Sequence, residues 1–285
     1  MQIIKSIQKM QSLASELREQ SKTIGFVPTM GFLHEGHLSL MRIARNKCGI
    51  LVVSLFVNPT QFGNDEDLDK YPHDFERDQK LCKQEDVDII FSPNVDEMYP
   101  DSFFTYVDVT GEMTDVLCGK FRPEHFRGVT TVVAKLFNII RPHISVFGQK
   151  DGQQLAVVKR MACDLNFPVE IIAGPTVRES DGLAMSSRNK YLSPEERTAA
   201  PILHQSLLFA KELIDSGERD SNRIIAMMRK LIEKKSLRLK IQYIAIVDAE
   251  TLEPLEQIRA KIMVALAVFL GNTRLIDNVI IEVGV

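Results

Sequence analysis

The sequence has 285 residues, 45% hydrophobic side chains and a formal net charge of -3 at pH 7, enough apolar material for one large core, with or without a small second one. This slightly acidic balance argues against an extended basic surface for nucleic acid. The apolar runs are far too short to span a membrane, and residues 1–20 lack the apolar centre of a signal peptide, so we expect a cytoplasmic protein without a membrane segment.

In chain order, short apolar segments alternate with segments that have helical spacing. The expected strands are 24–27, 50–57, 87–91, 103–109, 144–147 and 169–173, and the expected helices are 36–47, 75–85, 129–140 and 153–166. Near-continuous Ile, Val and Leu strands that alternate with helices are typical of a parallel sheet covered on both faces. We therefore predict an α/β fold with a Rossmann-like, doubly wound parallel sheet, in which ligands bind beyond the carboxyl ends of the strands.

The pattern changes in the last third of the chain. Helices are expected at 194–216 and 222–235, and strands at 240–247, 262–270 and 275–283. This order predicts a second, smaller α+β domain, with the first domain at 1–176 and the second at 177–285. We expect the second domain to act as a lid that excludes water from a reactive intermediate.

A pair of histidines follows the first expected strand, in the run from Pro28 to His37. The next helix is expected to begin near His34 and His37, where unpaired backbone N–H groups and the helix dipole favour an anion. Two imidazoles three residues apart can face one ligand, and Gly36 between them lets a base or ribose approach the backbone. The run predicts a nucleotide phosphate site. For either histidine alone, a surface or capping role is the alternative.

Four other polar segments carry groups that suit a charged ligand. Residues 58–63 bring two carboxamides, which can hydrogen-bond a hydroxyl and a carboxylate. Residues 148–154 bring a lysine for a phosphate and an aspartate that could cap the next helix. Residues 176–189 bring hydroxyls and arginines that suit the developing charge on a triphosphate, and residues 122–129 combine two guanidiniums with an imidazole. Each segment alone is also compatible with an ordinary loop, a helix entry or an interdomain connection.

A zinc site is the competing interpretation of the histidine pair. The metalloprotease signature is His-Glu-x-x-His, whereas this chain has His-Glu-Gly-His and no third ligand nearby. The four cysteines lie far apart in the sequence, so we expect reduced thiols rather than a disulfide scaffold. They are Cys48, Cys82, Cys118 and Cys163.

Over nearly its whole length, the chain resembles the pantothenate synthetases, also called pantoate–beta-alanine ligases. The matching motifs, in the same order, are 28–37, 56–62, 122–129, 148–154 and 185–189. That family is similar to the nucleotidyltransferases and class I aminoacyl-tRNA synthetases, which use a His-x-Gly-His element and a mobile loop around ATP. The resemblance implies that ATP and pantoate give pantoyl adenylate and pyrophosphate. The amine of beta-alanine would then attack the acyl group, which releases AMP and gives pantothenate.

The resemblance also implies roles for individual residues. His37 would be the catalytic residue and would donate a hydrogen bond or a proton to the triphosphate. Gln61 and Gln154 would bind pantoate, and Gln61 would also bind beta-alanine. The implied ATP-binding residues are Met30, Gly31, Phe32, Leu33, His34, Glu35, Gly36, His37, Gly148, Gln149, Lys150, Asp151, Val177, Met185, Ser186, Ser187 and Arg188. Further candidates for the site are Asn58, Tyr71, Arg122 and His125.

Magnesium is expected with ATP because a bound metal ion neutralises phosphate charge, and the protein ligands of that metal are left open. The resemblance also implies a homodimer through the first domain. Three alternatives compete with a ligase: a nucleotidyltransferase that moves AMP to a phosphate-bearing acceptor, a nucleotide-binding regulator without turnover, and a tRNA-charging enzyme. The acidic balance and the lack of a recognisable RNA-binding appendage disfavour the last.

Overall fold

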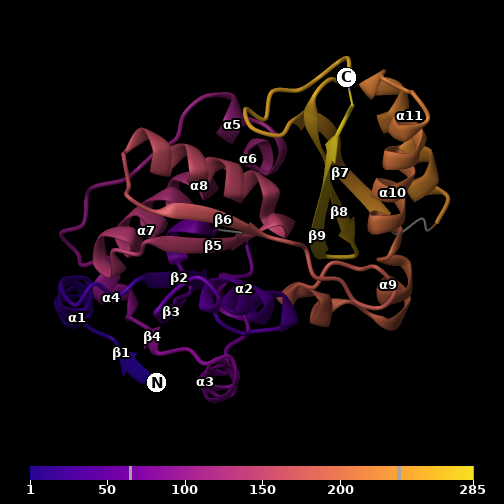
Figure 1. Ribbon diagram of the computed structural model, residues 1–285. Coiled ribbons are helices and arrows are strands. Elements are labelled where there is room, and N and C mark those ends of the chain that lie inside the picture. The colour runs from indigo at the N-terminus through magenta and orange to yellow at the C-terminus, as the bar shows by residue number, and fades with distance from the viewer. Residues whose placement is uncertain (64–65, 236–238, 285) are drawn as a thin grey trace. The chain divides into compact units, whose positions relative to one another are not determined.

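The computed structural model describes residues 1–63, 66–235 and 239–284, and the chain divides into two compact units (Figure 1). Unit 1 comprises Met1–Val109, Arg122–Gly148 and Val157–Pro175. Unit 2 comprises Thr110–Phe121, Gln149–Ala156 and Thr176–Val285. Each unit has its own sheet.

Unit 1 is built around a six-stranded parallel sheet with the strand order β1-β4-β3-β2-β5-β6. The strands are β1 (Gln2–Ile4), β2 (Ile24–Thr29), β3 (Ile50–Leu55), β4 (Ile89–Phe91), β5 (Ile144–Gly148) and β6 (Glu170–Gly174). From β2 the chain moves outward through β3 and β4, and it later returns to the other side of β2 with β5. The order therefore reverses between β2 and β5, and ligands of such sheets bind beyond the carboxyl ends of the strands at this point.

Helices cover both faces of this sheet (Figure 1). The helices of unit 1 include α1 (Ile7–Glu19), α2 (Glu35–Arg45), α3 (Phe75–Gln84), α4 (Val95–Met98), α7 (His125–Ile140) and most of α8 (Gly152–Asp164). Val146 of β5 belongs to the apolar core that the buried face of α2 forms. The next residue, Phe147, contacts Phe137 of α7 edge-on, because successive side chains of a strand point to opposite faces. The predicted doubly wound α/β fold is confirmed.

Unit 2 contains a three-stranded antiparallel sheet with the order β7-β8-β9. Its elements are β7 (Leu239–Asp248), β8 (Lys261–Leu270), β9 (Thr273–Glu282), α5 (Glu112–Asp115), α6 (Leu117–Phe121), α9 (Pro194–Ala199), α10 (Ile202–Asp215), α11 (Ser221–Glu233), and the 3₁₀ turns η3 (Gln149–Asp151) and η4 (Ser187–Tyr191). Apolar residues of α10 and α11 share a core with the sheet, among them Leu207, Met228 and Leu266, which are fully buried. The predicted smaller α+β part is thus present.

Two local predictions were wrong, and one strand was missed. Residues 103–109 form no strand; instead, the backbone N–H of Val107 donates to Thr131 Oγ1, and its carbonyl accepts from Thr130 Oγ1. The side chains of this segment alternate as in a strand. Its backbone, however, is hydrogen-bonded to two threonine hydroxyls of α7 and not to a neighbouring strand. The helix expected at 194–216 is interrupted around Pro201, since proline removes a backbone donor. Strand β1 was not predicted because three residues carry too little periodicity.

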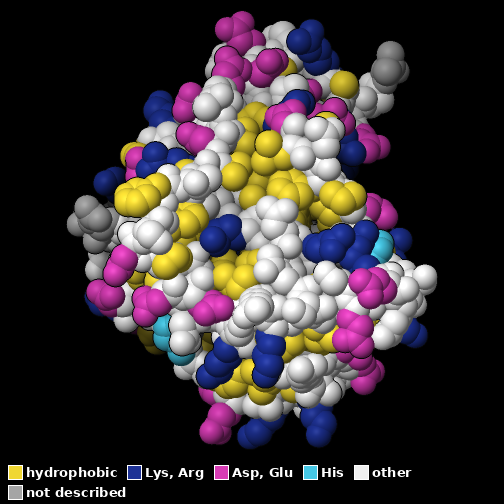
Figure 2. Space-filling model, turned by 90° about the vertical axis from the view of Figure 1, so that its left-hand side faces the viewer, with side chains coloured by type: hydrophobic (Ala, Val, Ile, Leu, Met, Phe, Trp, Pro, Cys, Tyr) yellow, Lys and Arg dark blue, Asp and Glu magenta, His cyan; other side chains and the backbone are white. Residues whose placement is uncertain are grey.

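The surface of the described residues is mixed in charge. Figure 2 shows Lys and Arg side chains interspersed with Asp and Glu side chains on the face in view. Among the described residues, no helix is both long and apolar enough to cross a membrane. All four cysteines carry free thiols.

Candidate functional site

The histidine motif begins with a tight turn at the carboxyl end of β2, beside the point where the strand order reverses. Gly31 and Phe32 have left-handed backbone conformations, with φ of +84° and +49°. Glycine adopts this conformation freely, whereas phenylalanine rarely does. Thr29 Oγ1 accepts the backbone N–H of Gly31 and donates to the carbonyl of Ser54 on β3, so the turn is tied to the neighbouring strand.

A buried carboxylate of α3 fixes the same turn. Asp78 is 2% exposed, and its two oxygens accept the backbone N–H groups of Phe32 and Leu33 at N···O distances of 2.7 and 2.8 Å. Burial raises the pKa of Asp78 and outweighs the two hydrogen bonds, which lower it. Sequence reasoning missed this residue, because it lies 46 residues beyond Phe32 in an ordinary polar helix.

The two imidazoles cap the first turn of α2. His34 is the N-cap, and its Nδ1 accepts the backbone N–H of Gly36 at 3.2 Å. His37 Nδ1 accepts the backbone N–H of His34 at 3.3 Å, and the two ring centroids are 4.1 Å apart. Because each Nδ1 accepts a hydrogen bond, the proton of each neutral ring lies on Nε2, which is therefore a donor. The capping role is confirmed, and in this tautomer Nε2 has the donor character that a phosphate oxygen requires.

The remaining side chains of this motif differ in their surroundings. The side chain of Leu33 is fully buried in the apolar core. A ligand could therefore contact only the backbone of this residue. The carboxylate of Glu35 forms an ion pair with Arg42 two turns further along α2. Met30 contributes its thioether sulfur to the carboxamide cluster that follows.

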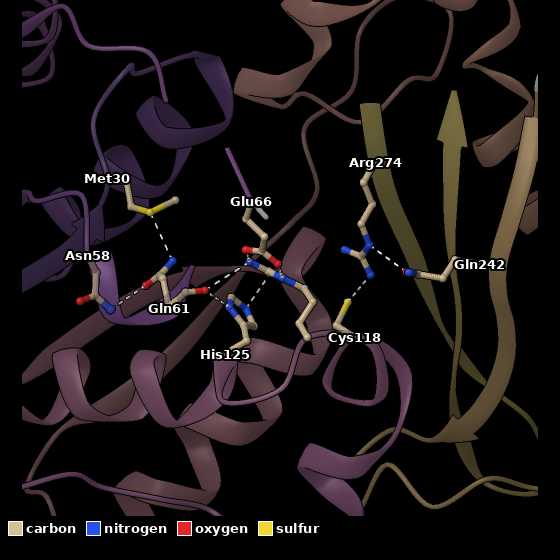
Figure 3. Close-up of polar contacts among 9 residues, drawn as sticks. Met30, Asn58, Gln61, Glu66, Cys118, His125, Gln242 and Arg274 are labelled. Carbon is tan, nitrogen blue, oxygen red and sulfur yellow. Dashed lines mark hydrogen bonds and ion pairs between the residues drawn. The ribbon is translucent and has the colours of Figure 1, made fainter. Parts of the chain in front are cut away.

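Gln61 is the centre of a carboxamide cluster in unit 1 (Figure 3). Its Oε1 accepts a hydrogen bond from Asn58 Nδ2 at 3.1 Å, and its Nε2 donates to Met30 Sδ at 3.3 Å. Asn58 is 1% exposed, and it also donates to the carbonyl of Gly128 and accepts from the hydroxyl of Tyr99. The predicted candidates Asn58 and Gln61 are thus in direct contact, and Met30 joins them.

Arg122 and His125 hold the backbone of the same glutamine. His125 Nδ1 lies 2.8 Å from the carbonyl oxygen of Gln61, and Arg122 Nη1 lies 3.0 Å from His125 Nε2. A guanidinium can only donate, so Nε2 is the acceptor, and Nδ1 carries the proton that it donates to Gln61. Arg122 also pairs in bidentate fashion with Glu66. Burial raises the pKa of Glu66, but the hydrogen bonds and charge of Arg122, the charge of His125 and the backbone N–H of Gly63 together outweigh burial and hold that pKa below its ordinary value.

A glycine lets α7 approach this cluster closely. A Cβ at Gly128 would lie 2.3 Å from the carbonyl oxygen of Thr60 and 2.7 Å from Gln61 Cα. Real Cβ atoms do not come this close to backbone atoms, so only glycine permits the contact. The motif 122–129 therefore brings Arg122, His125 and Gly128 to Gln61.

In unit 2, the Lys150 segment is held by β9. Lys150 lies in η3, directly after the end of β5 in the chain, and its Nζ is 3.2 Å from Asp151 Oδ1. Asn278 Nδ2 donates to the backbone carbonyls of Gln149 and Lys150. Its Oδ1 accepts from Gln149 Nε2. Sequence reasoning missed Asn278, since its partners lie more than 120 residues earlier in the chain.

The segment from Val177 to Arg188 also reaches β9. It folds back on itself, because Met185 N–H donates to the carbonyl of Val177. The Arg178 guanidinium forms a bidentate ion pair with Asp277, with N···O distances of 2.6 and 3.0 Å. Ser186 then caps η4, with its Oγ accepting the N–H of Arg188. The two phosphate-binding segments of the prediction are therefore held by neighbouring residues of one strand.

Two further predicted residues have other surroundings. Gln154 lies on α8 in unit 2, half-buried; its neighbour Gln153 is the buried one and hydrogen-bonds Cys118, Met113 and Val116. Tyr71 of unit 1 is buried and contacts Phe62 edge-on. By unit, the predicted residues are Met30, Gly31, Phe32, Leu33, His34, Glu35, Gly36, His37, Gln61 and Gly148 in unit 1, and Gln149, Lys150, Asp151, Gln154, Val177, Met185, Ser186, Ser187 and Arg188 in unit 2.

The family model for pantoate–beta-alanine ligase matches residues 2–280 of this chain. The chain belongs to the pantoate–beta-alanine ligase family. It is 58% identical to the pantothenate synthetase of Thermotoga petrophila over 281 residues, which cover 99% of this chain and 100% of that protein. It is 54% identical to the pantothenate synthetase of Moorella thermoacetica over 287 residues, covering 100% of both chains.

Solved structures agree with this assignment. The crystal structure of pantothenate synthetase from Thermus thermophilus matches with a TM-score of 0.92 at 43% identity, over 98% of this chain and 99% of that one. A pantoate–beta-alanine ligase from Francisella tularensis, complexed with beta-gamma ATP and beta-alanine, matches with a TM-score of 0.79 at 33% identity, over 98% and 97% of the two chains. The family predicted from the five motifs is confirmed.

Proposed function

We propose that this chain joins pantoate to beta-alanine in an ATP-dependent reaction that passes through an enzyme-bound pantoyl adenylate. The ligase activity follows from family membership across residues 2–280. The observation that carries the adenylate step is the histidine turn at the end of β2, where two imidazoles flank a helix N-terminus. Such an arrangement stabilises anionic phosphate oxygens.

In the first step, a carboxylate oxygen of pantoate attacks the α-phosphorus of ATP. The bond from that phosphorus to the bridging oxygen breaks, and pyrophosphate leaves. Charge grows on the departing phosphates, so donors that are already in place accelerate the step. We assign this role to His37 Nε2–H, with His34 beside it, because their Nδ1 atoms are engaged with the backbone and hold the rings in position.

In the second step, the amine of beta-alanine attacks the acyl carbon. The bond between that carbon and the AMP oxygen breaks, AMP leaves, and the amine loses a proton to give the amide. No covalent enzyme nucleophile is needed in either step. The turn from Met30 to His37 binds ATP in this proposal, with Gly148 near the adenine and ribose, and Gln61 lies near both acids.

The Gln61 side chain is suited to exchange partners. Its Nε2 donates to the thioether sulfur of Met30, which is a weak acceptor. A carboxylate or hydroxyl oxygen of pantoate is a much stronger acceptor and would replace the sulfur. Asn58, Arg122 and His125 meanwhile fix the remainder of Gln61 through its Oε1 and its backbone carbonyl. We assign Gln154, the second carboxamide, to pantoate as well.

Cationic and hydroxyl groups of unit 2 bind the phosphates in this proposal. Lys150 is a point charge with three donors, of which Asp151 occupies one. Ser186, Ser187 and Arg188 add hydroxyl and guanidinium donors, and Met185 precedes them in the chain. Each of these groups is attached to a segment that β9 holds, so each is restrained before ATP arrives. Val177, like Gly148, borders the adenine and ribose in this proposal.

Magnesium enters with ATP in this proposal. In residues 1–63, 66–235 and 239–284, no three His, Cys, Asp or Glu side chains are grouped to hold a metal ion. This suits Mg²⁺, which keeps several waters and takes its other ligands mainly from substrate phosphates. When bound, the ion neutralises phosphate charge.

We also propose a cytoplasmic homodimer. Four free thiols suit a reducing compartment. Phe104 is 85% exposed and Tyr106 is 48% exposed in unit 1, on a segment that α7 ties down through Val107. Exposed aromatic side chains on a restrained backbone are typical of an interaction surface, and we assign it to a second copy of this chain.

The proposal is tested by measuring AMP with ATP, pantoate and beta-alanine together and with each substrate omitted in turn. The ligase requires all three for continuous AMP formation, with pantothenate made in equal amount. AMP transfer to an acceptor without beta-alanine would favour a nucleotidyltransferase. ATP binding without any turnover would favour a regulator.

A further inference from the structure

We propose that Asp277 and Asn278, consecutive residues of β9, are positioning residues that set the spacing of the phosphate-binding groups of unit 2. The inference rests on the proposed function of those groups. Neither residue belongs to any motif of the sequence. Both are buried, with 3% and 6% of the residue exposed, and buried polar side chains need hydrogen-bond partners. Their partners are the two segments already assigned to ATP.

Asn278 fixes the backbone of η3. Its Nδ2 lies 3.0 Å from the carbonyl oxygen of Gln149 and 2.8 Å from that of Lys150, and its Oδ1 accepts from Gln149 Nε2. The side chain thus makes three hydrogen bonds to two consecutive residues. A Cβ at Gly152 would lie 3.1 Å from Asn278 Oδ1 and 2.7 Å from Met263 Sδ, so the start of α8 also packs tightly here. The position of the Lys150 backbone is therefore set by Asn278.

Asp277 fixes the other segment through Arg178. Arg178 forms the bidentate ion pair with Asp277, and its Nη1 also donates to the carbonyl of Gly182. The guanidinium therefore holds the segment that folds back between Val177 and Met185. One carboxylate oxygen of Asp277 accepts, in addition, the backbone N–H of Asn278. This contact ties the Asp277 carboxylate to the backbone of the next residue of β9. Ser186 and Arg188 directly follow the segment that Asp277 holds.

The consequence is a fixed spacing. The Cα atoms of consecutive residues are about 3.8 Å apart, and pairing with β8 along the whole of β9 holds the backbone that carries both side chains. A misplacement of about 1 Å in a catalytic arrangement can cost roughly 100-fold in rate. A strand whose side chains hold both segments prevents such misplacement. A carboxylate repels the phosphates of ATP, so Asp277 is not a direct ligand of ATP. Its effect on ATP binding must therefore pass through its ion pair with Arg178.

The direction in which ATP affinity changes in Asp277→Asn distinguishes a positioning role from a purely electrostatic one. Asp277→Asn removes one negative charge, and by Coulomb's law alone this change strengthens the binding of anionic ATP. If Asp277 is a positioning residue, the same change weakens binding, because the Arg178 segment loses its anchor. Asn278→Ala removes the anchor of η3 without any change of charge. Asp248→Asn is the matched control: it removes the same charge from β7 of the same sheet, where the carboxylate accepts hydrogen bonds from Glu250 and Thr251 of its own turn.

The experiment measures binding of the magnesium complex of ATP to the full chain by calorimetry, with steady-state KM values for ATP and beta-alanine. We expect Asp277→Asn and Asn278→Ala each to weaken ATP binding at least about tenfold, because each variant loses hydrogen bonds that hold a phosphate-binding segment. The KM for ATP should rise in parallel, while the KM for beta-alanine stays unchanged. Asp248→Asn should leave ATP affinity unchanged. Asp277→Asn should add nothing further in an Arg178→Gln background, since the two act as one unit.

Unchanged or tighter ATP binding in folded Asp277→Asn and Asn278→Ala proteins would overturn the inference, as would an equal loss in Asp248→Asn. Circular dichroism establishes which variants are folded. If Asp277→Asn does not fold, Arg178→Lys takes its place, since lysine keeps the charge but loses the bidentate fork; it must then weaken ATP binding too. Wild-type protein that binds ATP but makes no pantothenate would contradict the proposed function. The ATP affinities of the wild type and the Asp277 and Asn278 variants would still test the role of β9.

Discussion

In the proposed mechanism, replacing His37 removes the donor on which the adenylate step depends most. In His37→Ala the Nε2–H group is lost, and loss of one preorganised donor costs about 100-fold to 1,000-fold in turnover, or about 2.7–4 kcal/mol. The structural cost is smaller, because His37 Nδ1 makes one long cap contact of 3.3 Å with the N–H of His34. Loss of such a cap costs about 0.5–1 kcal/mol. Activity should therefore fall far more than stability.

Two further substitutions locate the active nitrogen. The amide nitrogen of glutamine reaches the place of Nε2, whereas that of asparagine reaches only the place of Nδ1. His37→Gln should therefore retain more activity than His37→Asn or His37→Ala. The assay is pyrophosphate release from ATP and pantoate before beta-alanine is added, with the melting temperature as control. Normal pyrophosphate release by His37→Ala, or equal losses in the glutamine and asparagine variants, would refute the role given to Nε2.

Three other changes test separate parts of the account. Glu66 has a lowered pKa because Arg122, with His125 and the Gly63 backbone, outweighs its burial, so its stabilising contribution is present at neutral pH and is lost as the pH falls below about 4. Glu66→Gln should lower the melting temperature at pH 7 and make progressively less difference in acid. Gly128→Ala places a Cβ against Thr60; it should cost at least about 1–3 kcal/mol of unfolding free energy, measured by urea denaturation, and reduce turnover. Phe104→Asp should convert a dimer to a chain of 32.3 kDa in light scattering.

Each of these changes has its own contrary outcome. A melting-temperature difference for Glu66→Gln that stays constant from pH 7 to well below pH 4 would mean that the ion pair contributes nothing. Gly49→Ala is the control for Gly128→Ala, since a Cβ there meets nothing closer than 3.7 Å; equal losses in both would remove the argument from close packing. A Phe104→Asp protein that keeps the mass of a dimer would place the interface elsewhere.

The sequence allowed the strands of both units other than β1, and most of their long helices, to be predicted, because their apolar residues recur at the spacing of a strand or a helix. The same reasoning failed at 103–109, where alternating side chains lie along α7 without a partner strand. It also failed at Pro201, where the apolar pattern continues across a break between α9 and α10. The spacing of apolar residues indicates which side chains are buried, but it does not indicate the hydrogen-bond partners of the backbone.

The candidate ligand-binding residues were nominated from motifs, but the residues that hold them in place were not. Asp78 fixes the histidine turn from 46 residues away, and Asp277 and Asn278 hold their segments across 99 and 129 residues. A lone aspartate in a polar helix, or an Asp-Asn pair in a strand, has no local feature that reveals a distant backbone partner. Only the fold brings these groups together.

The central claim is that pantoate is activated as an adenylate. Pantoate labelled with ¹⁸O in its carboxylate tests it most directly, because the attacking oxygen stays on phosphorus when the amine displaces AMP. Mass spectrometry of the products should find one ¹⁸O in each AMP and none in pyrophosphate. AMP without the label, or label in pyrophosphate, would contradict the account.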